Sequence, residues 1–277
     1  MRFTKMHGLG NDFIIIDDFH AKPSRDYNKL APRLCDRHFG IGADGLIIVL
    51  PSVKADVRMR IINPDGSEAE MCGNGIRCFA KYVYENGIAK KQVMSVETLA
   101  GIMKPELYIE NGEVKSVRVD MGKPDFEPAN IPAFMPGSRI VERPIEVDGE
   151  HYSITSLLMG VPHTVLFVDD VDAVDISTIG PKLEKYYAFP KKTNVNFVQV
   201  LNDHEIKVRT WERGAGATLA CGTGSCASAV ASAVTGRTGR SVTVHLFAGD
   251  LFIEWADDDT VFMTGPAAEV FRGEINI

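Results

Sequence analysis

The chain has 277 residues, of which 45% are hydrophobic and 24% are charged, with 37 acidic against 30 basic side chains. This length exceeds the usual single-domain range, so two domains are expected, and the ordinary composition leaves no room for a large disordered part. A net charge of -7 provides no basic stripe that could release counterions from a phosphate backbone. We therefore expect no nucleic acid as a partner.

The start of the chain and its apolar stretches argue against secretion and membrane insertion. Residues 1–13 are interrupted by glycine, asparagine and aspartate where a signal peptide would need an apolar core. Apolar stretches such as 45–50 are far too short to span a bilayer. A cytoplasmic location with no membrane partner is the expectation.

The first half of the chain reads as strands followed by one helix. Runs rich in β-branched and apolar residues predict strands at 13–17, 45–50 and 57–62. After Cys72, apolar residues recur at helical spacing as far as Tyr84, and a glycine at position 87 supplies the stop.

The second half repeats this order after a proline-rich connection. Residues 123–137 contain four prolines, which exclude a helix or a central strand and place a domain boundary near residue 120. Strands are predicted at 165–168, 196–200 and 205–210. The stretch after Cys221 is small and apolar on nearly every side, which suits a helix enclosed by sheet.

The two halves resemble each other in sequence. The segment from Arg58 around Cys72 is similar to the segment from Ile206 around Cys221, and each cysteine is followed by Gly-x-Gly and a helical pattern. Strand-rich stretches without regularly alternating helices disfavour a doubly wound parallel sheet. We predict an α+β fold of two pseudo-symmetric domains, each a curved mixed sheet wrapped around a central helix.

Cys72 and Cys221 carry the chemistry that the sequence suggests. Each of these cysteines lies where a loop turns into a helix. The free N–H groups of the first helical turn and the positive end of the helix dipole favour a thiolate at that point, and they can also bind a carboxylate. The dipole alone could lower a thiol pKa from about 8.5 to about 7. One thiolate could remove an α-proton from a bound amino acid while the opposite thiol protonates the other face, with no cofactor.

The other readings of these motifs are less favoured. Five cysteines, an odd number, fit reduced thiols rather than a disulfide framework. Cys35, Cys78 and Cys226 are expected to be buried small hydrophobes, and the helical spacing of the last two from Cys72 and Cys221 makes no metal clamp. No metal is therefore expected. The Gly-x-Gly motifs lack the third glycine and the Gly-Lys-Ser/Thr sequence of nucleotide sites.

Four motifs in order resemble the diaminopimelate epimerase family over essentially the whole chain: KMHGLGNDF, NPDGSEAEMCGNGIRC, TNVNFV and WERGAGATLACGTGSCA. The resemblance implies two α/β domains with the active site in the cleft between them. It implies that the last strand returns to the first domain, which gives domains of 1–120 with 266–277 and of 121–265. The implied activity interconverts LL- and meso-diaminopimelate in lysine and cell-wall precursor synthesis, with a small amino acid as the only ligand. A homodimer is a possible assembly.

The resemblance also assigns roles to individual residues. It implies that Cys72 and Cys221 are the acid and base, and that His163 and Glu212 adjust their pKa values. Glu212 also matches a substrate-binding position, and the further positions implied to bind substrate are Asn11, Asn63, Gly73, Asn74, Asn194, Arg213, Gly222 and Thr223. Arg213 is suited to hold a distal carboxylate in a bidentate fork.

The chain departs from the family pattern at three positions. Val161 stands where many members have asparagine, Gly45 where some have glutamine, and Ala217 where many have glutamate or another residue. These departures affect the expected binding of the distal end of the substrate and leave the cysteine pair unchanged.

Two alternatives remain open at this point. A proline or hydroxyproline racemase-like enzyme would use a similar cysteine pair but would not need Arg213 as an anchor for a second amino-acid end. A thiol redox or binding protein on the same scaffold would show no α-proton exchange.

Overall fold

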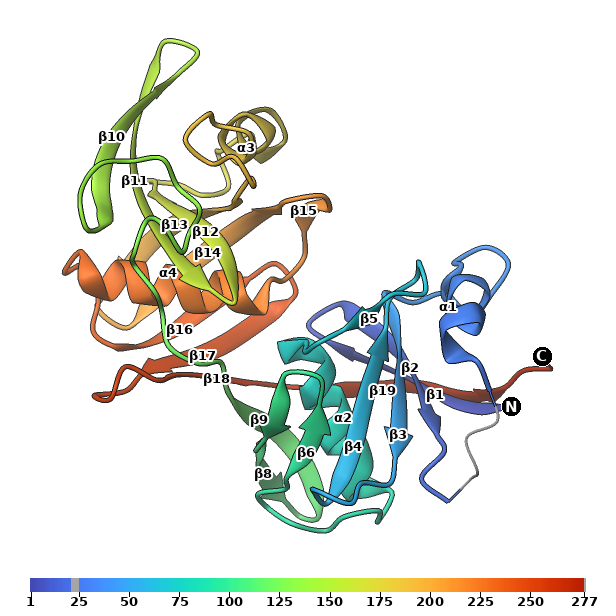
Figure 1. Cartoon of the computed structure of the whole chain (residues 1–277). Helices are drawn as coiled ribbons and strands as arrows, with labels where there is room; N and C mark the ends of the chain where they lie inside the picture. Colours follow the sequence, from blue (N-terminus) through green and yellow to red (C-terminus); the bar gives the residue numbers. More distant parts are fainter. Residues whose placement is uncertain (21–24, 277) are drawn as a thin grey trace. The chain divides into compact units, whose positions relative to one another are not determined.

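The computed structural model describes residues 1–20 and 25–276 (Figure 1). The chain divides into two compact units: unit 1 comprises Met1–Asp120 with Thr264–Ile277, and unit 2 comprises Met121–Met263. Residue 277, at the end of the expected 266–277 segment, lies outside the described residues. Each unit is described by itself below.

Unit 1 is built on a mixed sheet whose strands run in the order β19-β1-β2-β3-β4-β6-β7, with β5 paired to β4, and a β8–β9 hairpin. Its elements are β1 (Arg2–Gly8), β2 (Asn11–Asp17), α1 (Tyr27–Cys35), β3 (Gly45–Leu50), β4 (Val57–Ile62), β5 (Glu68–Ala69), α2 (Gly73–Glu85), β6 (Val96–Thr98), β7 (Gly101–Met103), β8 (Glu106–Glu110), β9 (Glu113–Asp120) and β19 (Ala268–Glu274).

Unit 2 has a sheet in which the strands run in the order β10-β11-β12-β13-β14-β16-β17-β18, with β15 paired to β14. Its elements are β10 (Ile140–Val147), β11 (Glu150–Met159), β12 (Val161–Phe167), α3 (Ile176–Glu184), β13 (Asn194–Asn202), β14 (Glu205–Glu212), β15 (Gly216–Thr218), α4 (Gly222–Val234), β16 (Ser241–Leu246), β17 (Gly249–Trp255) and β18 (Val261–Gly265), whose last two residues belong to unit 1.

The strand pairings repeat from one unit to the other. In unit 1, β2 runs parallel to β3, β3 antiparallel to β4, and β4 parallel to β6. In unit 2, β12 runs parallel to β13, β13 antiparallel to β14, and β14 parallel to β16. Helix α1 lies between β2 and β3 in the sequence, as α3 lies between β12 and β13. Helix α2 follows the short strand β5, which pairs with β4, and α4 follows β15, which pairs with β14. The predicted pseudo-symmetric α+β fold is therefore confirmed.

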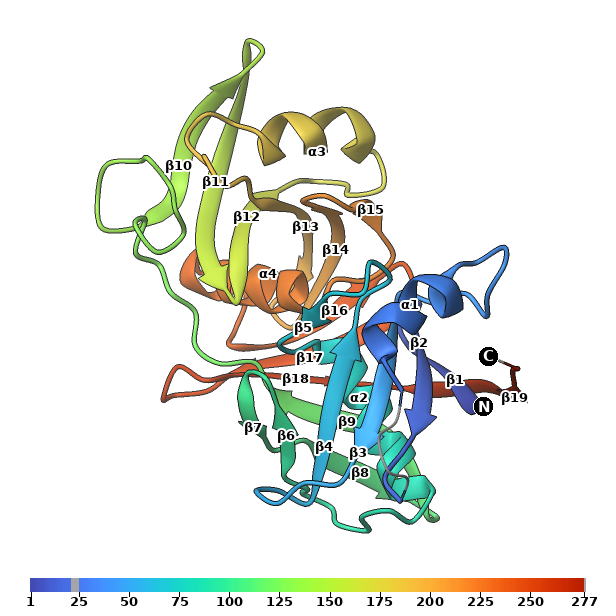
Figure 2. The same cartoon turned by 45° about the vertical axis from the view of Figure 1, so that its right-hand side comes forward.

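One helix lies at the centre of each unit. In unit 1, α2 packs against β1, β2, β3, β4 and β9, and in unit 2, α4 packs against β11 to β14, β16 and β17 (Figure 1). The second face of each sheet is covered by α1 or α3, which Figure 2 shows on the outer side of the strands. Because both faces are covered, central strands such as 45–50 are buried along their whole length.

The central helices follow directly from the sequence around them. The helix predicted after Cys72 is α2, and Gly87 just beyond its end has the positive φ of +74° that favours glycine. In α4 nine of the thirteen residues are buried, and they include three serines whose hydroxyls bond to carbonyls four residues earlier. The connection at 123–137 contains no helix and no named strand, as predicted.

Candidate active site

Cys72 is the N-cap of α2. Its backbone is extended, and its sulfur accepts a hydrogen bond from the N–H of Gly75 at 3.4 Å. The N–H groups of the first helical turn have no intrahelical partner, so the sulfur takes the place that a serine or aspartate oxygen usually holds. The side chain is partly exposed. A nucleophilic atom is thereby fixed at the positive end of the helix.

Asn11 and Asn74 lie beside Cys72. Asn11 Oδ1 is 3.7 Å from Cys72 Sγ and accepts a hydrogen bond from Asn74 Nδ2 at 3.2 Å. The amide of Asn11 is held from its other end by Asp44, whose Oδ2 accepts from Asn11 Nδ2 at 2.8 Å. Asp44 is itself bound by Arg37 at 2.7 Å. This chain of contacts turns an oxygen acceptor of Asn11 toward the thiol.

Asp12 is bound to the same arginine, Arg37, that binds Asp44. Burial alone would raise the pKa of Asp12, but hydrogen bonds from Arg37 and Lys5 hold it at about 2. Arg37 binds both carboxylate oxygens of Asp12, at 3.2 and 2.7 Å. The start of β2, which carries Asn11, is therefore fixed by a bidentate ion pair that stays charged at neutral pH.

Cys221 occupies the equivalent place at the start of α4. Its sulfur accepts from the N–H of Gly224 at 3.4 Å and lies 3.6 Å from the hydroxyl of Thr223. Unlike Cys72, it is buried, with 5% of its surface exposed. It also lines a pocket of about 160 Å³ within unit 2. Both predicted cysteines therefore cap the central helix of their own unit.

The expected lowering of the thiol pKa by the helix is wrong for Cys221. Burial raises the pKa of this thiol above its usual range, and the nearby Glu212 carboxylate raises it further. Hydrogen bonds from Thr223 and Gly224 act in the opposite direction but do not outweigh these effects. Cys221 is therefore held as a neutral thiol, because a buried sulfur beside a carboxylate cannot easily become a second anion.

Glu212, Arg213 and Asn194 come together at the ends of neighbouring strands. Glu212 ends β14, and its Oε1 accepts from the hydroxyl of Thr218 at 2.6 Å. The backbone N–H of Arg213 donates to Asn194 Oδ1 at 2.9 Å, and its guanidinium donates to the carbonyl of Lys191 at 3.2 Å. Arg213 and Asn194 are thus joined by a hydrogen bond next to Glu212 in the sequence, and the carboxylate of Glu212 acts on Cys221.

His163 lies inside unit 2 on β12, with no surface exposed. Burial, together with the cation of Arg213, lowers its pKa to about 3, so the ring is neutral at physiological pH. Its Nδ1 is 3.2 Å from Asn196 Nδ2. Its Nε2 has no hydrogen-bond partner among the described residues. Asn196 and Thr210, which bonds to it at 3.0 Å, were not singled out from the sequence.

Asn63 makes the contacts of a turn. Its Nδ2 donates to the hydroxyl of Ser67 at 2.9 Å, and its carbonyl accepts from the N–H of Gly66 at 2.9 Å. Gly66 has a φ of +85°, as the NPDG turn requires. By strand register, Asn63 corresponds to Glu212 of unit 2: Ile62 pairs with Leu46 and Trp211 pairs with Val195, and Asn63 and Glu212 are the next residues along the chain.

Two of the three departures from the family pattern, Val161 and Gly45, are at the starts of strands, whereas Ala217 is the middle residue of β15. Val161 opens β12 as Asn11 opens β2. Gly45 is opposite Phe13 at the start of the parallel pair β2–β3. In unit 2, Asn194 holds the equivalent position opposite His163 in the parallel pair β12–β13. A Cβ atom added at Gly45 would lie 3.1 Å from the carbonyl of Ile62, so the strand is closely approached there.

The remaining cysteines are buried and unlinked. Cys35, Cys78 and Cys226 form no disulfide, and burial raises the pKa of Cys35 to about 11 and that of Cys78 to about 12. Within residues 1–20 and 25–276 no group of three or more acidic, histidine or cysteine side chains is arranged to hold a metal ion. In the same ranges no helix combines the length and apolarity needed to cross a membrane.

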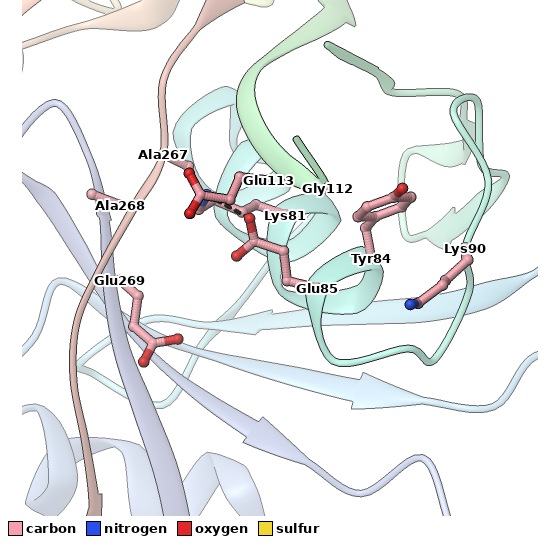
Figure 3. Close-up of a pocket in the computed structure, with 9 residues that line it drawn as sticks. All are labelled: Lys81, Tyr84, Glu85, Lys90, Gly112, Glu113, Ala267, Ala268 and Glu269. Atoms are coloured by element: carbon pink, nitrogen blue, oxygen red, sulfur yellow. Dashed lines mark hydrogen bonds and ion pairs between the residues drawn. The ribbon is translucent and has the colours of Figure 1, made fainter. Parts of the chain in front are cut away.

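A larger pocket in unit 1, of about 590 Å³, lies away from Cys72 (Figure 3). It is lined by the last turns of α2, where Lys81 and Glu85 point toward each other and form an ion pair at 2.7 Å. Lys81 also donates to the carbonyl of Val114 at 2.7 Å. Lys81 is nine positions after Cys72 along the helix, which corresponds to roughly 14 Å. These groups satisfy one another and hold the β8–β9 hairpin to the helix.

Comparison with solved structures shows the fold. A phenazine biosynthesis protein of the PhzF family from Bacillus anthracis superposes with a TM-score of 0.73 at 17% identity, covering 100% of this chain and 99% of that chain. A hydroxyproline epimerase from Agrobacterium vitis superposes with a TM-score of 0.69 at 16% identity, covering 99% and 91%.

Sequence comparison is more specific. The chain matches the family profile described as diaminopimelate epimerase over residues 3–127 and 155–270. It is 59% identical over 275 residues to the diaminopimelate epimerase of Pelotomaculum thermopropionicum, covering 99% of this chain and 98% of that protein. It is 57% identical over 277 residues to that of Caldanaerobacter subterraneus subsp. tengcongensis, covering all of both. The chain belongs to the diaminopimelate epimerase family.

Proposed function

We propose that this enzyme interconverts LL- and meso-diaminopimelate, in the synthesis of lysine and peptidoglycan precursors, by moving an α-proton between Cys72 and Cys221. The observation that carries the proposal is the duplicated helix start. In each unit the central helix begins with a cysteine whose sulfur accepts the N–H three residues later at 3.4 Å. A purely structural N-cap would be served by serine or aspartate, which bind the same N–H groups more strongly.

Two such thiols provide the base and the acid that inversion of one carbon atom requires. One sulfur, as the thiolate, takes the α-proton, while the other, as the thiol, gives its proton to the opposite face. The free N–H groups of the two helix starts, at Gly73, Asn74, Gly222 and Thr223, are suited to hold the reacting carboxylate as it takes up the developing charge. No cofactor is required in this scheme.

The environment of Cys221 determines the form in which it enters the reaction. Because its pKa is raised by burial and by Glu212, it enters as the thiol and acts first as the proton donor. Cys72, which is more exposed, then acts as the base. The reverse reaction exchanges these two roles, since the proton that Cys72 gains is the one it must return.

The second amino-acid end of diaminopimelate needs its own anchors. Arg213 is partly exposed, and its backbone N–H is held by Asn194. A guanidinium can bind a carboxylate through two parallel hydrogen bonds. Glu212 can accept from an ammonium. Asn11 and Asn63 are proposed to bind substrate from unit 1.

A substrate panel tests this proposal. The purified chain, dialysed against a chelator and without pyridoxal phosphate, is incubated with LL-diaminopimelate, meso-diaminopimelate, L-proline and trans-4-hydroxy-L-proline, and the isomers are separated by chiral chromatography. We expect conversion of both diaminopimelate isomers to one mixture and none of the two prolines. Conversion of a proline alone would contradict the proposal and favour a racemase.

A further inference from the structure

Asn196 is a fully buried asparagine on β13 whose side chain joins three groups. Its Oδ1 accepts a hydrogen bond from the hydroxyl of Thr210 at 3.0 Å. Its Nδ2 faces Nδ1 of His163 at 3.2 Å and the carbonyl oxygen of Thr164 at 3.5 Å. Every polar atom of this amide is therefore engaged inside unit 2.

These contacts fix the orientation of the amide. A backbone carbonyl can only accept, so the end of the Asn196 side chain beside Thr164 must be the NH₂ group. The opposite end is then the oxygen, which matches the hydroxyl of Thr210. Nδ1 of His163 consequently faces an N–H donor and must present a lone pair.

The orientation of the amide determines the tautomer of the histidine. A neutral imidazole carries one proton, and when Nδ1 accepts a hydrogen bond that proton lies on Nε2. Burial and Arg213 lower the pKa of His163 to about 3, so the ring does not take up a second proton near neutral pH. Nε2 is buried and has no partner among the described residues of the chain. Nε2–H is therefore a buried donor for which residues 1–20 and 25–276 provide no acceptor.

Asn196 also lies against the helix start that carries Cys221. A Cβ atom built on Gly224 would come within 2.5 Å of Asn196 Oδ1 and 3.2 Å of Cys221 Sγ. Glycine at this position lets the amide and the thiol approach the same point of the first turn of α4. The network of Thr210, Asn196 and His163 is therefore part of the surroundings of the reactive sulfur.

We propose that Asn196 is a positioning residue, which together with Thr210 keeps His163 in the neutral Nε2–H tautomer so that the ring can only donate toward an anion formed in the reaction. This inference rests on the proposed epimerase function. The fixed tautomer has two chemical consequences. The ring stabilises negative charge on a thiolate or a carboxylate, and it cannot compete with the cysteines for the α-proton because it offers no free lone pair.

The tautomer can be measured directly. In protein labelled with ¹⁵N at its histidines, long-range ¹H–¹⁵N correlation spectra distinguish Nδ1–H, Nε2–H and doubly protonated rings. The signals of His163 are identified among the seven histidines by their loss in His163→Gln. For the wild type we expect the Nε2–H form at neutral pH. An Nδ1–H or a doubly protonated ring would overturn the inference without any variant being needed.

The variant Asn196→Asp provides the second measurement. Aspartate has almost the same shape but replaces the donor with an acceptor, so the single ring proton of His163 should move from Nε2 to Nδ1 and Nε2 should cease to be a donor. We expect kcat to fall by on the order of a hundredfold, as for loss of one well-placed donor, with a smaller change in KM. The matched control Asn111→Asp, in the exposed turn between β8 and β9, should change neither the spectrum nor kcat.

The outcomes separate this inference from the proposed function. An Asn196→Asp protein that folds, retains the Nε2–H form and keeps wild-type kcat would overturn the positioning role. If the variant does not fold, the wild-type spectrum still decides. If the wild type shows the Nε2–H form but does not act on diaminopimelate, the proposed function fails while the assigned tautomer stands.

Discussion

The two sulfurs that we propose to be reactive have different surroundings, although they cap equivalent helices. Cys72 is partly exposed and lies 3.7 Å from an amide oxygen of Asn11, whereas Cys221 is buried beside the carboxylate of Glu212. The helix dipole, worth at most about 2 kcal/mol, is outweighed by burial at Cys221. In the proposed mechanism, substrate binding therefore supplies the remaining stabilisation of the Cys221 thiolate.

Arg213 is predicted to determine affinity for the distal carboxylate. Arg213→Ala removes a charge-assisted hydrogen bond worth about 1.5 to 3 kcal/mol, which corresponds to an increase of roughly 10- to 100-fold in KM for diaminopimelate. Steady-state kinetics in both directions measure this change. Arg33→Ala, which removes an exposed arginine of α1, is the control and should leave KM unchanged. Equal KM values for Arg213→Ala and the wild type would place Arg213 outside the site.

His163 is predicted to make folding sensitive to acid. Its pKa is about 3 in the folded chain and about 6.5 when unfolded, so between these values only the unfolded chain binds the proton. Its effect on stability is absent above pH 6.5 and destabilising below it, by about 1.4 kcal/mol per pH unit down to about pH 3. His163→Gln should lose this slope.

Urea unfolding of the two proteins between about pH 7 and pH 4 measures the difference. Acidic residues such as Asp12 titrate in both proteins and therefore cancel in the comparison. Parallel stability curves for wild type and His163→Gln would show that the buried ring is not neutral or not buried in solution.

At the scale of elements, the third residue after each cysteine distinguishes the two helix starts. An added Cβ at Gly75 would make only ordinary contacts, the nearest at 3.4 Å from Cys72 Cβ and Ile47 Cδ1. At Gly224 it would lie 2.5 Å from Asn196 Oδ1. The two starts are thus equivalent in topology but differ in how closely the sheet approaches the helix.

The matched variants Gly75→Ala and Gly224→Ala test this difference. Alanine favours a helix over glycine by up to about 1 kcal/mol, so Gly75→Ala should leave stability unchanged or slightly raised and retain activity. Gly224→Ala should lower the free energy of unfolding by about 1 to 3 kcal/mol through overpacking and should lower kcat by displacing Asn196. Chemical unfolding and kinetics of both proteins give the answer. The reverse ranking would contradict the described packing around α4.

The sequence was sufficient for the elements whose signals are local. Strands at 45–50 and 57–62 agree with β3 and β4 in full, and both central helices begin directly after their cysteines. Helices α1 and α3 were not predicted, although Asp26 and Asp175 serve as their N-caps. Each has a proline as its sixth residue, Pro32 or Pro181, which removes one hydrogen bond from the helix interior, so the local pattern does not favour a helix there. Packing of these helices against the strands, which the local sequence does not show, stabilises them.

The surroundings of the site depend on strand register and could not be predicted. Asn196 faces Thr210 because β13 and β14 are antiparallel in that register, and it reaches His163 because β12 and β13 are parallel. A shift of one residue would turn Asn196 to the opposite face of the sheet. The raised pKa of Cys221 is likewise a result of burial between distant segments, whereas its place at a helix start is visible in the sequence.

For the whole molecule, the account requires both units to act on one carbon. Each unit holds one cysteine cap, so neither can complete an inversion alone. Cys72→Ala and Cys221→Ala should each abolish interconversion of the isomers, while Cys226→Ala, which alters only the packing of α4, should affect mainly stability. Thermal unfolding of the three variants separates loss of folding from loss of chemistry.

Transfer between two thiols is tested most directly by following deuterium during a single approach to equilibrium. The chain is incubated with LL-diaminopimelate in deuterated water. At early times the LL and meso isomers are separated, and the deuterium content of each is measured by mass spectrometry. The departing α-proton goes to one sulfur while the opposite sulfur, equilibrated with solvent, delivers deuterium. We predict one deuterium in nearly every meso molecule and almost none in the recovered LL substrate. Equal early labelling of both isomers would show that a single base serves both faces, which would contradict transfer between two thiols.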